Sequence, residues 1–304
     1  MNLHNTTKPL VSVITPVYNG IEHIAACIQS VAHSRTNNRI DIEHIIIDDG
    51  SADQTLMAIE AAIAELAYPE MYTYRLLRLP HSGKPASVRN HGIAEAKGHY
   101  IFCLDHDDIL LQNTLRYMVE HLETTGREMA YGDFLRSDDR LAYDIGNDYC
   151  GIAFTDTHAA LYSLFKGDHF FQHSFMFTKR LWQQLGGYDD AITYGEDFDL
   201  CVRSILAGHM TEHVPITTHI HRNHSKSLTA CYGHRCAVWL EEHQAHYRKF
   251  RKQLPRYLAP QELSEIEEVL QITPHMQPNE PLSKERASTL TAIRKATELT
   301  MVGV

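Results

Sequence analysis

The sequence predicts an α/β protein in which a mostly parallel sheet is flanked by helices and is followed by a helical C-terminal extension. Residues 11–105 alternate short apolar runs with segments whose apolar residues recur at helical spacing, the order that a doubly wound sheet requires. The apolar runs are followed by polar residues that favour turns. Beyond residue 233 the chain becomes helical and more charged. We therefore expect one α/β domain over residues 1–233 and a helical extension over residues 234–304.

The first half of the chain contains four apolar runs of strand length, at residues 11–15, 42–48, 72–77 and 100–104. Helical spacing predicts helices between them, over residues 21–34 and 53–66 and from the loop at 81–85 to residue 97. Asp53 is a suitable cap for the second of these helices, and Gly98 is a suitable stop for the third.

The second half contains fewer strand patterns and more helices. Strands are predicted at residues 128–135 and 170–178. Helices are predicted at residues 112–124, 158–165, 196–207, 235–253, 260–271 and 283–299. Residues 136–168 are otherwise irregular, so we expect loops around the short helix there.

The composition of the chain restricts its class. Its 304 residues are 43% hydrophobic and 22% charged, which suffices for a sizeable core. The net charge of −10 argues against nucleic-acid binding, which needs a basic face. The six cysteines lack CxxC spacing, and Cys103 and Cys201 lie in apolar runs, so we expect reduced core thiols. No apolar stretch has the length of a transmembrane segment and no signal-peptide core is visible, so we expect a cytoplasmic location.

An acidic cluster, Asp105-His106-Asp107-Asp108, follows the apolar run at residues 100–104. Carboxylates crowded at the end of a buried strand repel one another unless water or a cation lies between them. Mg²⁺ is typically held by one or two carboxylates together with substrate phosphates. Ligands of open α/β sheets bind beyond the carboxyl ends of the strands, where this cluster lies. The alternative is a solvated acidic turn, because Asp is common in turns.

Two earlier strands end in comparable polar turns, Pro16-Val17-Tyr18-Asn19-Gly20 and Asp48-Asp49-Gly50-Ser51. If the three strands are parallel neighbours, their polar ends converge. Phosphate-loop fingerprints are missing, because Pro85 follows Gly83-Lys84 where Walker A needs Ser or Thr. No GxGxxG follows the first strand, which argues against a dinucleotide dehydrogenase.

Six segments together resemble family 2 glycosyltransferases of the GT-A fold. They are SVITPVYNG (12–20), IIIDDGSADQT (45–55), GKPASVRNHG (83–92), LDHDD (104–108), GGYDD (186–190) and GEDFDLCVR (195–203). Each is weak alone, but they follow the order and spacing of the family across about residues 10–230. The resemblance implies a Rossmann-like GT-A domain with its nucleotide-binding part at about residues 10–108. Its acceptor-binding and catalytic part would lie at about residues 109–233.

The resemblance implies a nucleotide-sugar donor held across the first half of the sheet. Pro16 and Tyr18 match positions that line the base and ribose pocket. Asp49, next to Asp48, matches the carboxylate that reads a pyrimidine ring. A carboxylate can accept the imide hydrogen of uracil, which favours a UDP-sugar. Alternatively, Asp48 and Asp49 shape the turn and cap the next helix.

Lys84 and Arg89, with Gly83 and Asn90, match the segment that lies near the donor diphosphate. Lys84 stands beside Gly83 at the start of a helix, where anions bind readily. Arg89 is a forked partner for phosphate. The alternative for Arg89 is an exposed helix residue without a partner.

The resemblance assigns Asp105 and Asp107 to the DxD pair that contacts ribose and metal. Asp108 shares the ligation or caps the following helix. The family usually has a small residue where His106 stands, so the role of His106 is open.

His224 matches a late histidine that in relatives reaches the metal or the diphosphate. A histidine added to carboxylates favours Mn²⁺ relative to Mg²⁺, so Mn²⁺ or Mg²⁺ is the expected cofactor. The alternative is a zinc site of His219, His221 and His224, whose HxHxxH spacing is loose.

Glu196 and Asp197 open a helix where the resemblance places the catalytic base of an inverting transferase, most often the aspartate. One carboxylate must take the proton of the acceptor hydroxyl as that hydroxyl attacks the anomeric carbon. The alternative is an acidic first turn that is stabilised by the helix dipole.

We therefore expect metal-dependent, inverting transfer of a single sugar from a UDP-sugar to a hydroxyl of a glycan or lipid-linked acceptor, as in bacterial surface polysaccharide or glycoconjugate synthesis. The QxxRW motif and membrane helices of processive synthases are absent. The alternatives are a sugar-nucleotidyltransferase and a non-catalytic scaffold that binds sugar nucleotides or glycans. Residues 247–257 interleave basic and aromatic residues, which suits a solvated helix or peripheral contact with the inner membrane face. The C-terminal helices are compatible with acceptor recognition or a homodimer.

Overall fold

The computed structural model describes residues 8–34, 39–67, 73–143, 149–167, 174–225 and 236–272. These residues belong to two compact units. The first unit comprises Met1–Ala160 and Phe170–His224, and the second comprises Leu161–His169 and Ser225–Val304. The domain boundary predicted at residue 233 lies outside the described residues.

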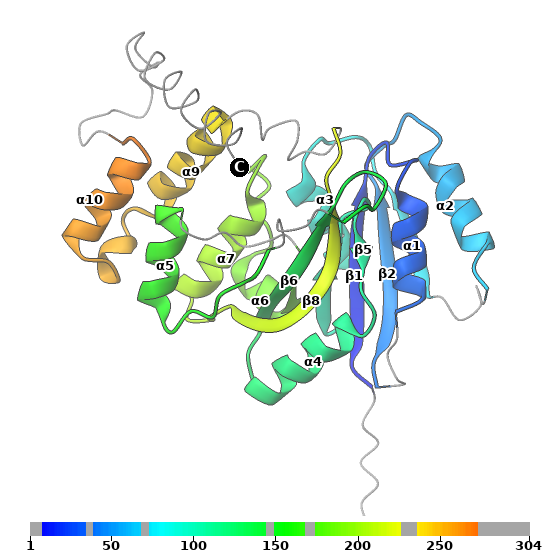
Figure 1. The fold of residues 1–304 in the computed structure, drawn as a ribbon, viewed down its shortest axis with the longest axis horizontal. Coiled ribbons are helices and arrows are strands. Elements are labelled where there is room, and N and C mark those ends of the chain that lie inside the picture. Colours follow the sequence, from blue (N-terminus) through cyan, green and yellow to red (C-terminus); the bar gives the residue numbers. More distant parts are fainter. Residues whose placement is uncertain are drawn as a thin grey trace, which may run out of the picture. The chain divides into compact units, whose positions relative to one another are not determined.

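An eight-stranded sheet forms the centre of the first unit, counted over the described residues, in the order β3-β2-β1-β4-β7-β6-β8-β5. Strands β1, β2, β5, β6 and β8 are labelled in Figure 1. Its strands are β1 (Leu10–Val17), β2 (Asp41–Asp48), β3 (Tyr74–Arg78), β4 (Tyr100–Cys103), β5 (Ile109–Leu110), β6 (Met129–Ser137), β7 (Phe175–Thr178) and β8 (Glu212–Arg222). The four strands β3, β2, β1 and β4 are all parallel, and β6 is parallel to β8. The pairs β4–β7, β6–β7 and β5–β8 are antiparallel. The predicted α/β class is confirmed, and the sheet is mixed with a parallel half.

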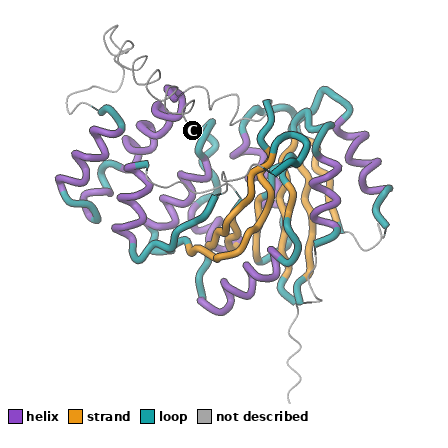
Figure 2. Tube along the Cα trace, in the orientation of Figure 1, coloured by secondary structure: helices purple, strands orange, loops and turns teal. Residues whose placement is uncertain are grey.

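Helices cover both faces of this sheet, and Figure 2 shows the strands in orange with helices in purple beside them. They are α1 (Ile24–Ala32), α2 (Thr55–Ala64), α3 (Pro85–Glu95), α4 (Thr114–Thr125), α6 (Lys179–Leu185) and α7 (Glu196–Leu206), together with the first residues of α5 (Thr157–Lys166). Helices α1 and α4 share one buried cluster with β1 and β4, and α1 and α2 share another with β1 and β2. Helix α3 packs on the opposite face, where a Cβ on Gly92 would meet Ile47 at 2.6 Å. The fold is therefore doubly wound.

The secondary structure follows the sequence pattern closely in the parallel half and less closely beyond it. The strands and helices expected before residue 126 are present, with shifts of a few residues at their ends. The sequence did not predict β5, α6 or β8. Strand β8 contains no continuous apolar run and its burial does not alternate, so it lacks the pattern by which a strand is recognised.

The second unit is helical where it is described. It contains the end of α5, α9 (Cys236–Phe250), the 3₁₀-helix η2 (Leu254–Arg256) and α10 (Pro260–Val269). The Phe165 ring packs edge-on against Tyr247, with ring centroids 6.1 Å apart. His243 Nε2 lies 3.2 Å from the Leu164 carbonyl oxygen, and Tyr162 hydrogen-bonds Glu265. The helix predicted at residues 283–299 lies outside the described residues.

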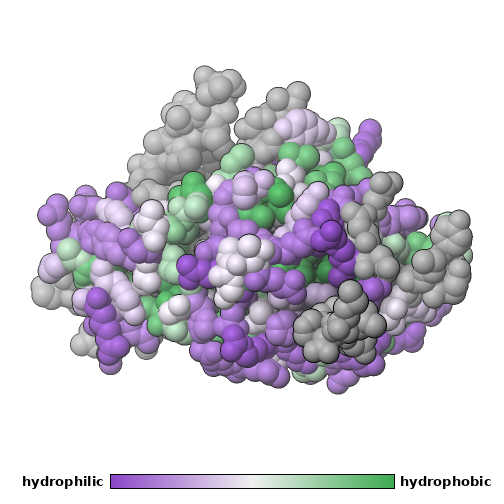
Figure 3. Space-filling view, turned by 90° about the horizontal axis from the view of Figure 1, so that it is seen from below, coloured by the Kyte–Doolittle hydropathy of each residue, from purple (hydrophilic) through white to green (hydrophobic). Residues whose placement is uncertain are grey.

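One face of the protein carries mostly hydrophilic residues, with hydrophobic residues in small separate groups (Figure 3). Among the residues that the structure describes, no helix is both long and apolar enough to cross a membrane.

Candidate functional site

The candidate site begins where the parallel strands end. In β1, Val17 pairs with Asp48, the last residue of β2, and Ile14 pairs with Cys103, the last residue of β4. The polar turns after β1, β2 and β4 therefore lie along one edge of the sheet. This confirms the predicted convergence of the three strand ends.

The turns after β1 and β2 hold each other in place. Asn19 has a left-handed backbone with a φ of 50°, and its Oδ1 accepts a hydrogen bond from Ala52 N at 2.8 Å. Ser51 Oγ accepts from Asn19 N at 2.9 Å, and Asp48 Oδ1 accepts from Ser51 N at 3.2 Å. Pro16 is partly exposed within β1. Asp48 therefore supports the turn, as the alternative reading of this residue expected.

Asp49 holds the loop that follows β3. Its Oδ1 accepts from the backbone N and the hydroxyl of Ser82, at 2.9 and 3.0 Å. Its Oδ2 accepts from Gly83 N at 3.1 Å and lies 3.0 Å from His81 Nδ1. The His81 ring also stacks on Tyr18, with centroids 3.9 Å apart and an interplanar angle of 19°. Tyr18, Asp49 and His81 thus form one cluster, and the sequence did not single out His81.

Lys84 precedes α3, as expected from its position at a helix start. Its Nζ lies at the surface, 3.3 Å from the Asp190 carbonyl oxygen. Asn90 lies one helical turn after Ala86 and is fully engaged, because its amide binds Tyr188, Asp190 and Trp182. Asn90 therefore fixes α3 to the segment after α6.

Arg89 lies at the centre of a buried ion-pair network. The residue is 4% exposed. Its NH2 donates to Asp105 Oδ1 at 2.7 Å, and its NH1 contacts Glu196 Oε1. Burial alone would lower the pKa of Arg89, but Asp105 and Glu196 outweigh burial and raise it well above its usual range. The alternative of an exposed Arg89 without a partner is wrong, because the guanidinium links the DxD loop to α7.

Asp107 and His224 come from distant parts of the chain and contact each other. Asp107 Oδ2 lies 2.8 Å from His224 Nε2. This hydrogen bond to Asp107 raises the pKa of His224 above its ordinary value. The sequence predicted both residues as metal ligands, and the structure places their ligating atoms next to each other.

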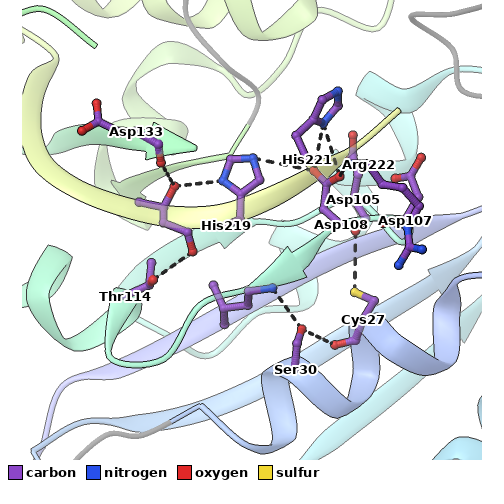
Figure 4. A network of polar contacts seen from close by, with 12 residues as sticks. Cys27, Ser30, Asp105, Asp107, Asp108, Thr114, Asp133, His219, His221 and Arg222 are labelled. Carbon is purple, nitrogen blue, oxygen red and sulfur yellow. Dashed lines mark hydrogen bonds and ion pairs between the residues drawn. The ribbon is translucent and has the colours of Figure 1, made fainter. Parts of the chain in front are cut away.

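Asp108 is fully buried and faces β8 (Figure 4). Its Oδ1 accepts from Arg222 N at 3.0 Å and lies 3.3 Å from His221 Nδ1. His219 Nε2 lies 3.7 Å from Asp108 Oδ2. Asp108, His219 and His221 form a cluster whose ligand atoms are close enough to hold a metal ion. Asp108 is thus placed with these two histidines, away from the carboxylate–imidazole contact of Asp107 with His224.

The His106 side chain packs against the backbone of the turn that follows β1. A Cβ added to Gly20 would come 2.4 Å from His106 Cδ2, so the imidazole packs directly on the Gly20 backbone. His106 therefore fills the space between the turn after β1 and the DxD loop.

Two further residues that the sequence did not indicate approach His224. His23 is 7% exposed, its ring centroid is 4.6 Å from that of His224, and its Nε2 is 3.3 Å from Asp139 Oδ1. Burial, followed by the charges of Arg222 and His224, lowers the pKa of His23. No sequence signal marked either residue, because His23 lies within an amphipathic helix pattern and Asp139 lies in a loop.

Glu196 and Asp197 open α7 and occupy different surroundings. Glu196 is 7% exposed and is held by Arg89. Asp197 is partly exposed, and its Oδ1 accepts from Phe198 N at 2.7 Å. Arg89 contacts both Glu196 and Asp105, so the start of α7 is joined to the turn that follows β4.

The residues present at this edge fit a divalent cation. Asp107 supplies a carboxylate and His224 an imidazole, a donor set suited to Mn²⁺. Two ligands about 2.1 Å from one ion lie roughly 3 Å apart when they are adjacent, close to the 2.8 Å between Asp107 Oδ2 and His224 Nε2.

Comparison with known proteins agrees with this geometry. The sequence profile of glycosyl transferase family 2 matches residues 12–182, and that of glycosyl transferase family group 2 matches residues 100–274. The glycosyltransferase GlyG of Streptococcus pneumoniae serotype 4 is 28% identical over 145 residues, which are 46% of this chain and 46% of GlyG. The chain thus spans less than half of the length of this relative.

Solved structures share the fold. TarS of S. aureus (residues 1–349) in complex with UDP gives a TM-score of 0.57 at 14% identity, covering 86% of this chain and 81% of the TarS chain. The mannosyltransferase PcManGT of Pyrobaculum calidifontis, in complex with GDP-Man and Mn²⁺, gives 0.59 at 17% identity, covering 97% and 81% of the two chains. These similarities confirm the predicted GT-A-like architecture.

Proposed function

Because the chain belongs to glycosyl transferase family 2 and is therefore a glycosyltransferase, we propose that it transfers a single sugar from a UDP-sugar to a hydroxyl of a glycan or lipid-linked acceptor. The reaction would invert the anomeric centre and would use Mn²⁺ or Mg²⁺. The donor would lie along the carboxyl ends of β1, β2 and β4.

The observation that carries this proposal is the contact between Asp107 Oδ2 and His224 Nε2, 2.8 Å apart at this edge. An aspartate and a histidine from distant parts of the chain offer a divalent cation two adjacent ligands. A bound cation would offset the negative charge of the departing diphosphate. In this proposal Asp107 and His224 hold the cation, and Asp105 contacts the donor ribose and the cation.

We assign recognition of the uracil ring to Tyr18, Asp49 and His81, with Pro16 and Asp48 shaping the pocket. Tyr18 is 41% exposed, and the His81 ring stacks on one of its two aromatic faces. TarS has been solved with UDP and PcManGT with GDP-Man, so the fold alone does not decide the base. The uridine assignment rests on the Asp49 carboxylate, which accepts hydrogen bonds in this cluster and can accept one from an imide.

We assign the diphosphate to Lys84, whose ammonium lies at the surface beside the start of α3. Arg89 is buried between two carboxylates, so in this proposal it acts as a positioning residue. It holds Asp105 for the donor and orients the first turn of α7 through Glu196.

We assign the base to Asp197. Its carboxylate would take the proton of the acceptor hydroxyl as that oxygen attacks the anomeric carbon and the bond to the diphosphate breaks. Glu196, held by Arg89, would orient this turn. A single carboxylate base with direct attack accounts for inversion.

The test is a thermal-shift comparison of UDP, GDP and ADP with Mn²⁺. A ligand present at a hundredfold excess over its Kd stabilises the protein by about 2.7 kcal/mol, so UDP should raise the Tm most. Asp107→Ala should abolish the Mn²⁺-dependent part of the UDP shift, because one cation ligand is lost. Hydrolysis or transfer of UDP-GlcNAc and other UDP-sugars, measured as UDP release, separates an enzyme from a binding scaffold.

Asp41→Ala is the matched control, because Asp41 is an exposed carboxylate at the opposite end of β2, with Lys8 Nζ 3.6 Å from its Oδ1. This variant should keep the full UDP shift. Equal shifts with all three nucleotides would contradict the uridine assignment, and an unchanged Mn²⁺ dependence in Asp107→Ala would contradict the metal assignment.

A further inference from the structure

His23 stands at the start of helix α1, but its side chain does not cap the helix. It is the N-cap residue of α1, a position where Ser, Thr, Asp and Asn are preferred because their side chains accept hydrogen bonds from the helix. The His23 side chain makes no such bond. It is instead buried, and its Nε2 points toward Asp139, with Oδ1 3.3 Å away. The His23 imidazole therefore does not stabilise the start of α1 by a hydrogen bond.

The His23 Nε2 atom is buried without a hydrogen bond to any atom of the described residues. Leaving a buried polar atom without a partner is costly, and such atoms in native proteins often mark an ion or water that completes them. A neutral imidazole nitrogen in this state is a ready metal ligand.

Arg222 ties together the two loops that carry Asp107 and Asp139. It is 5% exposed, its Nε donates to the Asp107 carbonyl oxygen at 2.8 Å, and its NH1 donates to the Asp139 carbonyl oxygen at 2.6 Å. The DxD loop and the loop after β6 are thus tied together by one side chain. Because Arg222 binds backbone oxygens, the side-chain carboxylates of Asp107 and Asp139 are left to face the two histidines.

Three of the four side chains place their ligand atoms in one cluster, and the fourth, Asp107, adjoins that cluster through His224. One ligand atom each from His23, Asp139 and His224 lies within 4.8 Å of the others. His224 Nε2 is also 2.8 Å from Asp107 Oδ2, and His23 Nε2 is 3.3 Å from Asp139 Oδ1. Neighbouring ligands about 2.1 Å from one ion are separated by roughly 3–3.5 Å in octahedral or tetrahedral geometry.

We propose that His23 and Asp139 complete, with Asp107 and His224, a four-ligand site that binds a transition-metal dication before any nucleotide arrives. The inference rests on the proposed function, because it concerns the same cation. It adds two protein ligands to that cation. Two imidazoles and two carboxylates suit Mn²⁺, Fe²⁺ or Zn²⁺ better than Mg²⁺, which prefers oxygen ligands.

The consequence is that the cation does not depend on the donor diphosphate for its retention. A site with only one or two protein ligands needs the phosphates to hold the ion. Four protein ligands suffice without them, so the full chain should bind one Mn²⁺ in the absence of nucleotide.

The experiment titrates the full-length, EDTA-stripped protein with MnCl₂ without nucleotide and follows free Mn²⁺ by electron paramagnetic resonance. The wild type should bind one equivalent. His23→Ala and Asp139→Asn should each weaken that binding at least about tenfold, since even residues behind the ligands typically contribute 10–100-fold. Asp139 is 59% exposed, so Asp139→Asn should keep the fold. If His23→Ala does not fold, the Mn²⁺ affinity of Asp139→Asn tests the proposal.

His33→Ala is the matched control, because His33 is an exposed histidine at the other end of α1, and it should bind Mn²⁺ like the wild type. His221→Ala tests the competing cluster of Asp108, His219 and His221. Loss of nucleotide-free binding in His221→Ala but not in Asp139→Asn would overturn the proposal. It would also be overturned if the wild type bound Mn²⁺ only together with UDP, an outcome that leaves the proposed function intact. Failure to bind Mn²⁺ even with UDP would overturn both.

Discussion

At the scale of single residues, Glu196 and Asp197 show how two adjacent carboxylates come to have different surroundings. Glu196 is buried against the Arg89 guanidinium, while Asp197 is partly exposed at the same helix start. The family resemblance marked both as candidates at the start of a helix and favoured the aspartate as the base. The sequence did not reveal the contact that sets Glu196 apart, because its partner Arg89 lies 107 residues away in the chain.

Asp197→Asn should reduce turnover by about 10²–10⁴-fold, the usual contribution of a positioned general base. The amide keeps the size of the side chain but cannot take the acceptor proton, so UDP affinity should be unchanged. The measurement is kcat from UDP release, together with the Kd for UDP from calorimetry.

Glu196→Gln is the comparison for this prediction, because it alters the orientation of α7 and leaves the base in place. It should lower turnover less than Asp197→Asn does. An inactive Glu196→Gln beside an active Asp197→Asn would exchange the two roles, and full turnover in both would place the base elsewhere.

At the scale of secondary-structure elements, the strands beside the site that the sequence predicted are those that are continuous apolar runs. The run Ile45-Ile46-Ile47 predicts β2, and Tyr100 to Leu104 predicts β4, so the polar residues after them were placed correctly. Strand β8 carries His219, His221 and Arg222 but reads as an irregular polar segment. The sequence therefore could not predict the histidine cluster around Asp108 or the bridge formed by Arg222. Both depend on the pairing of β8 with β6 and β5, which joins segments far apart in the chain.

His44, which links β1 and β2, should make the stability of the fold depend on pH. His44 is fully buried in β2, its Nε2 lies 2.8 Å from Thr15 Oγ1 in β1, and burial lowers its pKa from 6.5 to about 3. The unfolded chain binds this proton near pH 6.5 and the folded chain does not until about pH 3. The folded state therefore loses stability as the pH falls through this window, and the contribution is fully present above pH 6.5.

Between pH 7.5 and 5.5 this single group should lower the free energy of unfolding by about 1.4 kcal/mol. Urea unfolding at the two pH values measures the change. His44→Gln keeps a hydrogen-bonding group but does not titrate. Between pH 7.5 and 5.5 the free energy of unfolding of this variant should therefore fall by about 1.4 kcal/mol less than that of the wild type. A variant with the full wild-type pH slope would show that His44 is not the titrating group.

At the scale of the whole molecule, the sequence led us to expect a division near residue 233. The structure joins Leu161–His169 to the C-terminal helices in one compact unit. In α5, Leu161, Leu164 and Phe165 are fully buried, and Phe165 contacts Tyr247 and Phe250 of α9. A truncation after Gly233 would remove these partners, so it tests the stability of α5 as much as the independence of the donor site. The sequence could not predict that α5 packs with α9, because the apolar spacing of a ten-residue helix does not indicate which distant helix it contacts.

A milder change inside the second unit tests whether donor binding depends on it. Phe165→Ala removes a fully buried ring and should cost about 3–5 kcal/mol of stability. The residues assigned to UDP and the cation all lie in the first unit, so the increase in Tm that UDP and Mn²⁺ produce should equal that of the wild type. Val269→Ala, at a 43% exposed position of α10, is the control and should leave the Tm nearly unchanged. If Phe165→Ala remains folded by circular dichroism but loses the UDP-dependent shift, the second unit contributes to donor binding and the assignment of the site to the first unit alone is wrong.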